Sequence, residues 1–258
     1  MAGTPAPAER LDPWRLAHDT AAEAGVSLRP LTTIQDAAHL RAILAATWGG
    51  QDLTPEYVPA LALSGNVSWA AFDGDDAVGY VLGWAGVDDE GLHVHSHQLA
   101  TLASYRRRGV GAALKFAQRA QALDQGITVV RWTFDPMVTR NAIFNLNRLG
   151  TTADGFHRDF YGAMDDEMNR GERSDRLVTR WDLRREPGPR DLPASARRVA
   201  VPSDYQGLRA ADAPRASAAR EDVARGIEAA LADGLVAAAF DAEASAYVFV
   251  TPAEAEAA

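Results

Sequence analysis

The sequence predicts a mixed α/β fold (α+β class): helices flank a mostly antiparallel central sheet, and a small α/β lobe follows at the carboxyl end. Three observations lead to this prediction. Residues 67–101 hold three β-rich runs separated by acidic, glycine-containing turns, as in an antiparallel meander. Further on, amphipathic stretches that end at glycine alternate with strand-like runs. Three prolines within residues 186–193 then interrupt regular structure, because proline continues neither a helix nor a ladder.

Each element follows from a local pattern. Helices are expected where apolar residues recur every three or four positions, with proline at the start or glycine after the end. They are 13–24, 36–48, 55–63, 107–125, 139–149 and 214–233. Strands are expected where β-branched and aromatic residues gather between turn residues. They are 27–31, 67–72, 77–87, 92–101, 127–134, 155–161, 177–183, 235–240 and 244–251. Trp132 and Phe134 share one face of the strand 127–134 and are expected to be core residues rather than a substrate platform.

The order of these elements predicts four segments. Residues 1–26 form a Pro/Ala-rich tail and a helix, and residues 27–185 form the main domain. Residues 186–197 are expected to be a linker because of their prolines. Residues 198–258 form a small carboxyl-terminal lobe, in which we find no chemical motif.

Composition excludes several classes of protein. The 258 residues are 47% hydrophobic and 24% charged, which excludes a fibrous or wholly disordered chain. The absence of cysteine excludes disulfides, thiolate zinc sites and a cysteine nucleophile. A net charge of −9 argues against nucleic acid as a partner. The sequence contains neither a signal-like start nor a long apolar run, so we expect a cytoplasmic protein without membrane contact.

The sharpest motif is the run Arg106–Ala112 (RRRGVGA), between a predicted strand and a predicted helix. Gly109 and Gly111 let the backbone curve tightly, so that successive N–H groups face an anion at the positive end of the helix. The motif therefore predicts a diphosphate cradle, although paired glycines also serve as plain turn devices. A Rossmann fingerprint would need a third glycine where Leu114 stands, and the P-loop pattern is absent.

A second motif is the alternation of His93, His95 and His97 on one predicted strand. Alternate residues of a strand share a face, so the three imidazoles line up. Neutral imidazole is a suitable general base for an ammonium group near pH 7. Two alternatives stay open: a metal site, because H-x-H on a strand can chelate, and plain hydrogen-bonded histidines without a role in catalysis.

Taken together, the motifs resemble the GNAT superfamily of N-acetyltransferases. The likeness spans about residues 27–184 and rests on R-x-x-G-x-G at Arg106–Gly111 and on Asn141-Ala142 opening a later helix that ends Arg148-Leu149-Gly150. The segments HSHQLA, WTFDP, RNAIFNLNRLG and FYGAMDD are more narrowly similar to an uncharacterised bacterial group of predicted GNAT acetyltransferases.

The resemblance implies a cofactor and its contacts. The sheet would splay between its fourth and fifth strands, 92–101 and 127–134, and the pantetheine arm of acetyl-CoA, or of another acyl-CoA, would fill the gap. No metal is implied. The implied cofactor contacts are Leu99, Ala100, Thr101, Arg106, Arg107, Arg108, Gly109, Val110, Gly111, Ala112 and Asn141.

The resemblance also implies a mechanism. His97, backed by His95 and water, would deprotonate a primary amine that attacks the thioester directly in a ternary complex. The family tyrosine that reprotonates the thiolate is missing, since Leu146 stands at its position. Tyr161 is the substitute candidate, although a core tyrosine is the alternative interpretation.

Acceptor contacts are expected from two acidic residues, Asp135 after the fifth strand and Asp166 in the loop before the last strand of the main domain. A turn-capping role for Asp135 and a solvated charged turn around Asp166 are the alternatives. The expected acceptor is a small-molecule amine or a peptide. A catalytically weak acyl-CoA sensor is the alternative function, and a homodimer through the carboxyl-terminal lobe is a further expectation.

Overall fold

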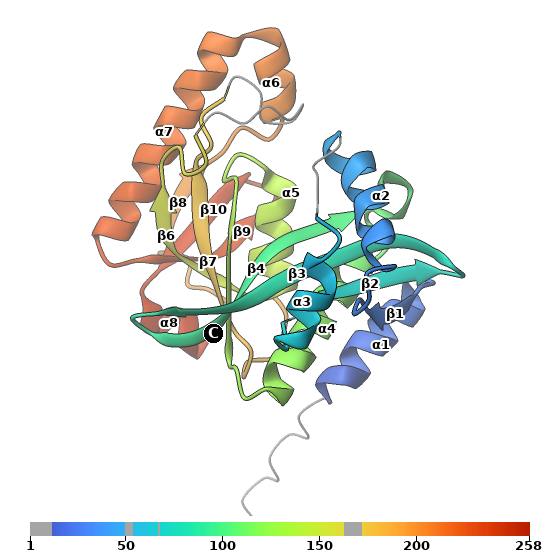
Figure 1. Cartoon of the computed structure of the whole chain (residues 1–258). Coiled ribbons are helices and arrows are strands. Elements are labelled where there is room, and N and C mark those ends of the chain that lie inside the picture. Colours follow the sequence, from blue (N-terminus) through green and yellow to red (C-terminus); the bar gives the residue numbers. More distant parts are fainter. Residues whose placement is uncertain (1–11, 50–53, 67, 163–171) are drawn as a thin grey trace, which may run out of the picture. The chain divides into compact units, whose positions relative to one another are not determined.

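The computed structural model describes residues 12–49, 54–66, 68–162 and 172–258, and its elements are labelled in Figure 1. Contacts group the chain into two compact units. Unit 1 comprises residues 1–84 and 97–126, and unit 2 comprises residues 85–96 and 127–258. Strands β3 and β4 run from one unit into the other. Within the described residues, no helix combines the length and the apolar character needed to cross a bilayer.

Unit 1 holds the amino-terminal helices and the first strands, in the sheet order β1-β2-β3-β4. Its elements are α1 (Pro13–Glu23), β1 (Ser27–Pro30), α2 (Ala37–Trp48), α3 (Tyr57–Leu63), β2 (Ser68–Asp73), β3 (Asp76–Asp88), β4 (Gly91–Thr101), the 3-10 helix η1 (Ala103–Tyr105) and α4 (Val110–Asp124). β2 pairs antiparallel with both β1 and β3, as the meander predicted.

Two apolar clusters form the core of unit 1. One joins α2 and α3 to the sheet through residues such as Leu40, Val58 and Tyr80. The other includes residues of α1 and α4 with Val78 and Val81 of β3. Close packing of β3 requires a glycine, because a Cβ at Gly79 would lie 2.9 Å from the carbonyl oxygen of Ala100.

Unit 2 continues from the shared strands with the sheet order β4-β5-β7-β6-β9-β10-β8. Its elements are β5 (Val129–Phe134), α5 (Thr139–Ala142), the π-helix η2 (Ile143–Arg148), β6 (Thr152–His157), β7 (Arg176–Asp182), β8 (Arg197–Ala200), α6 (Tyr205–Ala211), α7 (Ala213–Ala232), β9 (Val236–Asp241), β10 (Ala246–Val250) and α8 (Pro252–Ala257).

The strand pairing confirms the predicted fold class, a mixed and mostly antiparallel sheet flanked by helices. β5 pairs antiparallel with β7, and β6, β7, β8, β9 and β10 pair antiparallel with their neighbours. β4 and β5 pair in parallel at Val94↔Val130 and His95↔Arg131. This pairing covers the first part of each strand, as expected for strands that part further along.

Residues 198–258 differ from the separate lobe that the prolines predicted. β9 pairs with β6 at Ala153↔Ala237, so the carboxyl-terminal strands extend the sheet of unit 2, where Figure 1 shows β6, β9 and β10 side by side. One apolar cluster contains both Phe134 and Leu177 from the earlier strands and Tyr247 from β10. The physical reason is that β6 offers an edge whose apolar face is covered only when β9 and β10 pack beside it.

Several local elements differ from their prediction. The helix expected over 139–149 is one α-helical turn followed by the π-helix η2, and the strand expected over 155–161 is β6, Thr152–His157. β8, α6 and α8 were not predicted, because they are only four to seven residues long and offer little periodicity. Trp132 and Phe134, predicted to be core residues, are buried.

Candidate functional site

The glycine turn lies in unit 1, where the chain passes from β4 through η1 into α4. Arg107 has a φ of +63° and Gly109 has a φ of +99°, so the backbone turns through two left-handed residues before the helix. Ala113 N–H donates to Gly109 O at 3.0 Å as a first helical bond. The N–H groups just before it have no partner within the helix, since an α-helix leaves its first donors unpaired, and they stand at its positive end.

Three arginine side chains surround this turn, and all three residues are exposed. Arg106 Nε donates to Thr101 O at 3.4 Å. The Arg108 guanidinium lies 4.7 Å from the centre of the Tyr105 ring and donates to Ala24 O at 3.5 Å. The turn thus combines backbone donors with exposed guanidinium groups, which is the donor set that a diphosphate requires.

The end of β4 leads into this turn. Leu99 packs against the cluster of α1 and α4, whereas Ala100 is buried in the cluster of α2 and α3. Beside them, Tyr80 Oη donates to Gln98 Oε1 at 2.8 Å, and burial of Tyr80 raises the pKa of its hydroxyl. The alternation of faces confirms an extended strand from which the backbone of Leu99–Thr101 enters η1.

The histidine row lies on β4, with His97 in unit 1 and with His93 and His95 in unit 2. The His97 ring packs against Trp84, with 4.7 Å between ring centres. Burial of the ring lowers the pKa of His97, although the residue as a whole keeps an exposed surface. A lowered pKa leaves the imidazole neutral near pH 7 and able to accept a proton. No cluster of three metal-ligating side chains occurs among the residues that the structure describes.

In unit 2, Asn141 belongs to the short helix α5. Its N–H donates to Val138 O at 2.8 Å, which fixes the start of the helix. Leu146, at the position of the missing family tyrosine, is fully buried in the apolar cluster that includes Tyr247 and Phe249. A side chain at position 146 contacts the apolar core, so a leucine in place of the family tyrosine agrees with these surroundings.

Tyr161 lies beyond the end of β6 and is 45% exposed, so it is not the core tyrosine of the alternative interpretation. Its hydroxyl is 3.4 Å from Thr133 Oγ1 of β5, and the Arg176 guanidinium lies 5.2 Å from its ring centre. Tyr161 N–H donates to Ser174 Oγ at 2.8 Å, which holds its backbone. The exposed hydroxyl leaves a proton donor available at this surface.

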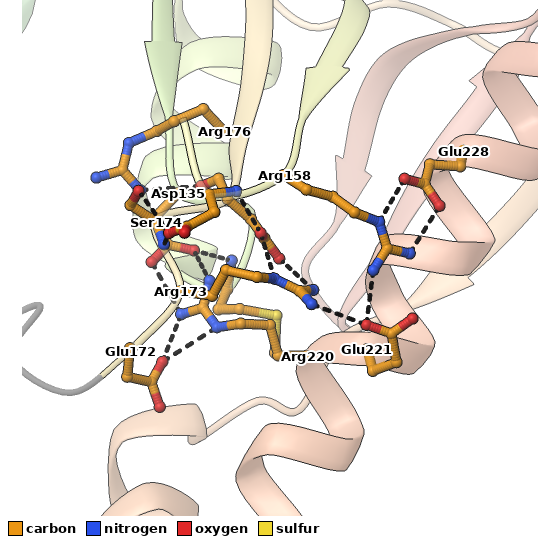
Figure 2. Close-up of polar contacts among 12 residues, drawn as sticks. Asp135, Arg158, Glu172, Arg173, Ser174, Arg176, Arg220, Glu221 and Glu228 are labelled. Atoms are coloured by element: carbon orange, nitrogen blue, oxygen red, sulfur yellow. Dashed lines mark hydrogen bonds and ion pairs between the residues drawn. The ribbon is translucent and has the colours of Figure 1, made fainter. Parts of the chain in front are cut away.

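Asp135 follows β5, and its carboxylate is already engaged. Arg220 of α7 donates to both of its oxygens at 3.1 Å, and Met137 N–H donates to Oδ1 at 2.8 Å. Figure 2 shows Asp135 within a network of arginines and carboxylates. Asp166, the other predicted acceptor contact, lies outside the described residues.

The sequence did not predict this network around Arg220. Besides Asp135, Arg220 donates to Glu172 Oε2 at 2.7 Å and to Tyr205 Oη at 3.2 Å. Tyr205 Oη in turn donates to Glu172 at 2.7 Å. Arginine is common in this chain, so its presence on a helix carries no signal for a buried partner far away in the sequence.

Comparisons with known proteins agree with the fold. Residues 37–148 match the family model described as the acetyltransferase (GNAT) family. Residues 37–148 are a GNAT acetyltransferase domain. The match includes β2 to β5, the Gly109 turn and Asn141, so the predicted resemblance is confirmed on the motifs that carried it. No curated protein matches the chain.

Solved structures are similar to part of this chain. Naa20 of Chaetomium thermophilum, in complex with a bisubstrate analogue, is 18% identical with a TM-score of 0.50, and the match covers 62% of this chain and 88% of that one. The ribosomal-protein-S18-alanine N-acetyltransferase of Escherichia coli is 12% identical, with a TM-score of 0.49 and coverage of 65% and 99%. At 18% identity, the likeness to Naa20 concerns the fold alone.

The left-handed turn predicts a stability effect at Gly109. We expect Gly109→Ala to lower the free energy of unfolding by about 1–2 kcal/mol in urea denaturation, because a Cβ is disfavoured at this φ. The new Cβ would lie 3.6 Å from Ala24 Cβ, an ordinary contact, so the strain comes from the backbone. Arg107→Gly is the matched control: it relieves a left-handed residue but adds chain entropy, and we expect a change near zero. Equal losses in both variants would contradict this account.

Proposed function

We propose that the protein is an acyl-CoA-dependent N-acyltransferase that transfers acetyl from acetyl-CoA to a primary amine. The observation that carries this proposal is the GNAT family match over residues 37–148, which contains the Gly109 turn. Acetyl-CoA supplies the thioester, and the chain binds and orients it. The amine nitrogen bonds to the acetyl carbon, the carbon–sulfur bond breaks, and the sulfur leaves as coenzyme A thiolate.

The binding role of the turn is supported by its donors. Its exposed arginines and the first N–H groups of α4 suit the diphosphate, and the backbone of Leu99–Thr101 suits the amides of the pantetheine arm. Asn141 is assigned to the arm near the thiol. None of these proposed cofactor contacts is a metal ligand, and the proposed reaction uses no metal ion.

The proton transfers are assigned to His97, His95 and Tyr161. His97 accepts the ammonium proton, and His95 with water passes it on; the lowered pKa of His97 supports its role as a base. Tyr161 is proposed to return a proton to the thiolate, which its exposed hydroxyl supports. Because coenzyme A thiolate is a tolerable leaving group near neutrality, turnover does not depend on a tyrosine at position 146.

The acceptor is proposed to be a small-molecule amine or a peptide amine, with Asp135 and Asp166 as its acidic contacts. The bisubstrate analogue in the Naa20 structure supports a ternary complex. We further propose a cytoplasmic protein that requires neither nucleic acid nor membrane, and a homodimer as its assembly. The runner-up function, an acyl-CoA sensor, is favoured by Leu146 at the position of the general acid.

A thiol-release screen tests the proposal. Acetyl-CoA is incubated with the protein and a panel of amines and peptides, and free thiol is measured with a chromogenic disulfide. The chain contains no cysteine, so every thiol detected comes from coenzyme A. Its single lysine, Lys115, is buried, which limits self-acetylation as background. We expect amine-dependent release; tight binding of coenzyme A without release from any amine would favour the sensor.

A further inference from the structure

Arg220 is a buried arginine in the middle of α7, and it joins three distant segments of unit 2. Its side chain is 6% exposed, and those of its partners Asp135 and Glu172 are 15% and 13% exposed. The guanidinium binds Asp135 through a pair of hydrogen bonds, both 3.1 Å long, and binds Glu172 at 2.7 Å (Figure 2). A planar fork of this kind fixes its carboxylate in both distance and orientation.

The loop that Arg220 holds leads directly to α5. Asp135 accepts from Met137 N–H at 2.8 Å, and Tyr247 Oη of β10 donates to Pro136 O at 2.9 Å. One residue later, Val138 O accepts the N–H of Asn141 at 2.8 Å. The path from the guanidinium to the backbone of Asn141 therefore crosses one turn of chain, and it consists of these hydrogen bonds and the peptide bond between Met137 and Val138.

We propose that Arg220 is a positioning residue for coenzyme A binding, which through Asp135 fixes the loop 135–138 and thereby the place of Asn141. This inference rests on the proposed function, in which Asn141 contacts the arm of the cofactor near the thiol. The carboxyl-terminal helix α7 would then contribute to cofactor binding, although the family motifs all precede residue 150.

Other ion pairs of α7 do not reach this loop. Arg158, after β6, binds Glu228 at 2.6 Å and Glu221 at 2.7 Å, and Arg173 binds Glu221 at 2.9 Å. These pairs hold α7 to the sheet but contact none of residues 135–138. A general loosening of α7 is thus separable from a displacement of the loop.

The two carboxylates of Arg220 provide a matched pair of variants. Asp135→Asn and Glu172→Gln each remove one negative charge of similar burial from the same guanidinium, but only the first alters the loop that leads to Asn141. Binding is measured by calorimetry with two probes: coenzyme A, and 3′-phosphoadenosine 5′-diphosphate, which lacks the pantetheine arm. Neither probe requires the acceptor to be known.

We expect Asp135→Asn to weaken coenzyme A binding about tenfold, the scale of one charge-assisted hydrogen bond, and to leave binding of 3′-phosphoadenosine 5′-diphosphate within about twofold. Glu172→Gln should leave both affinities within about twofold. Arg220→Lys keeps the positive charge but loses the planar fork, so it should also weaken binding of coenzyme A and not of 3′-phosphoadenosine 5′-diphosphate. This variant replaces Asp135→Asn in the experiment if Asp135→Asn does not fold.

Equal losses in Asp135→Asn and Glu172→Gln, equal losses for the two probes, or an unchanged affinity in Asp135→Asn and Arg220→Lys would overturn the positioning role. A wild-type protein that binds neither probe would instead overturn the proposed function. The two failures are therefore distinguishable in one set of titrations.

Discussion

Replacement of His97 with alanine is expected to lower amine-dependent thiol release by about 10²–10⁴-fold, the usual contribution of a positioned general base. Affinity for coenzyme A should not change, because the proposed diphosphate and arm contacts come from other residues. Steady-state thiol release measures the first quantity and calorimetry the second. His93→Ala is a suitable control, since His93 lies on the same strand but 3.6 Å from Asp88 at the other end of the row. Equal turnover in wild type and His97→Ala would remove His97 from the mechanism.

The pH profile tests the same base. Burial lowers the pKa of His97 below its ordinary 6.5, so the imidazole stays unprotonated at pH 7 and gains a proton only in more acidic solution. The basic form is the active one, so kcat should decrease in acidic solution, and the midpoint of this decrease should lie below pH 6.5. This acidic limb should be lost in His97→Ala. A limb centred well above 6.5 would indicate a different base.

Replacement of Arg220 with methionine should produce the largest loss of stability. We expect about 3–5 kcal/mol, because the change removes the cation that two largely buried carboxylates share. Asp135 then keeps the Met137 N–H, and Glu172 keeps Arg209 at 3.4 Å. Urea denaturation followed by circular dichroism measures this difference.

Arg158→Gln is the matched control for Arg220→Met. Arg158 also binds two carboxylates of α7, but its side chain is 34% exposed, and solvent screening reduces such pairs to about 0–1 kcal/mol. A loss in Arg158→Gln as large as that in Arg220→Met would show that anchoring of α7 matters rather than burial of the network. A loss below about 1 kcal/mol in Arg220→Met would show that the carboxylates find other partners or water.

Short-range sequence patterns predicted several structural features of this protein. Gly109 and the arginines before it predicted a tight turn into a helix, because only short-range backbone sterics decide such a turn. The alternation of Trp132 and Phe134 predicted a buried strand face, and both residues are buried. Pro214 predicted the start of the long helix, which begins at Ala213. Each of these signals lies within a few residues of the feature that it predicts.

Tertiary structure alone decided the rest. The partner of Asp135 is Arg220, 85 residues away, and no local pattern connects them. Likewise, β9 lies beside β6 because an edge and an apolar face became available there, and Leu146 is buried because the carboxyl-terminal strands cover it. Periodicity states which face of an element is apolar but not which element will cover it. That choice depends on packing between segments far apart in the chain, and it is visible only once they have folded together.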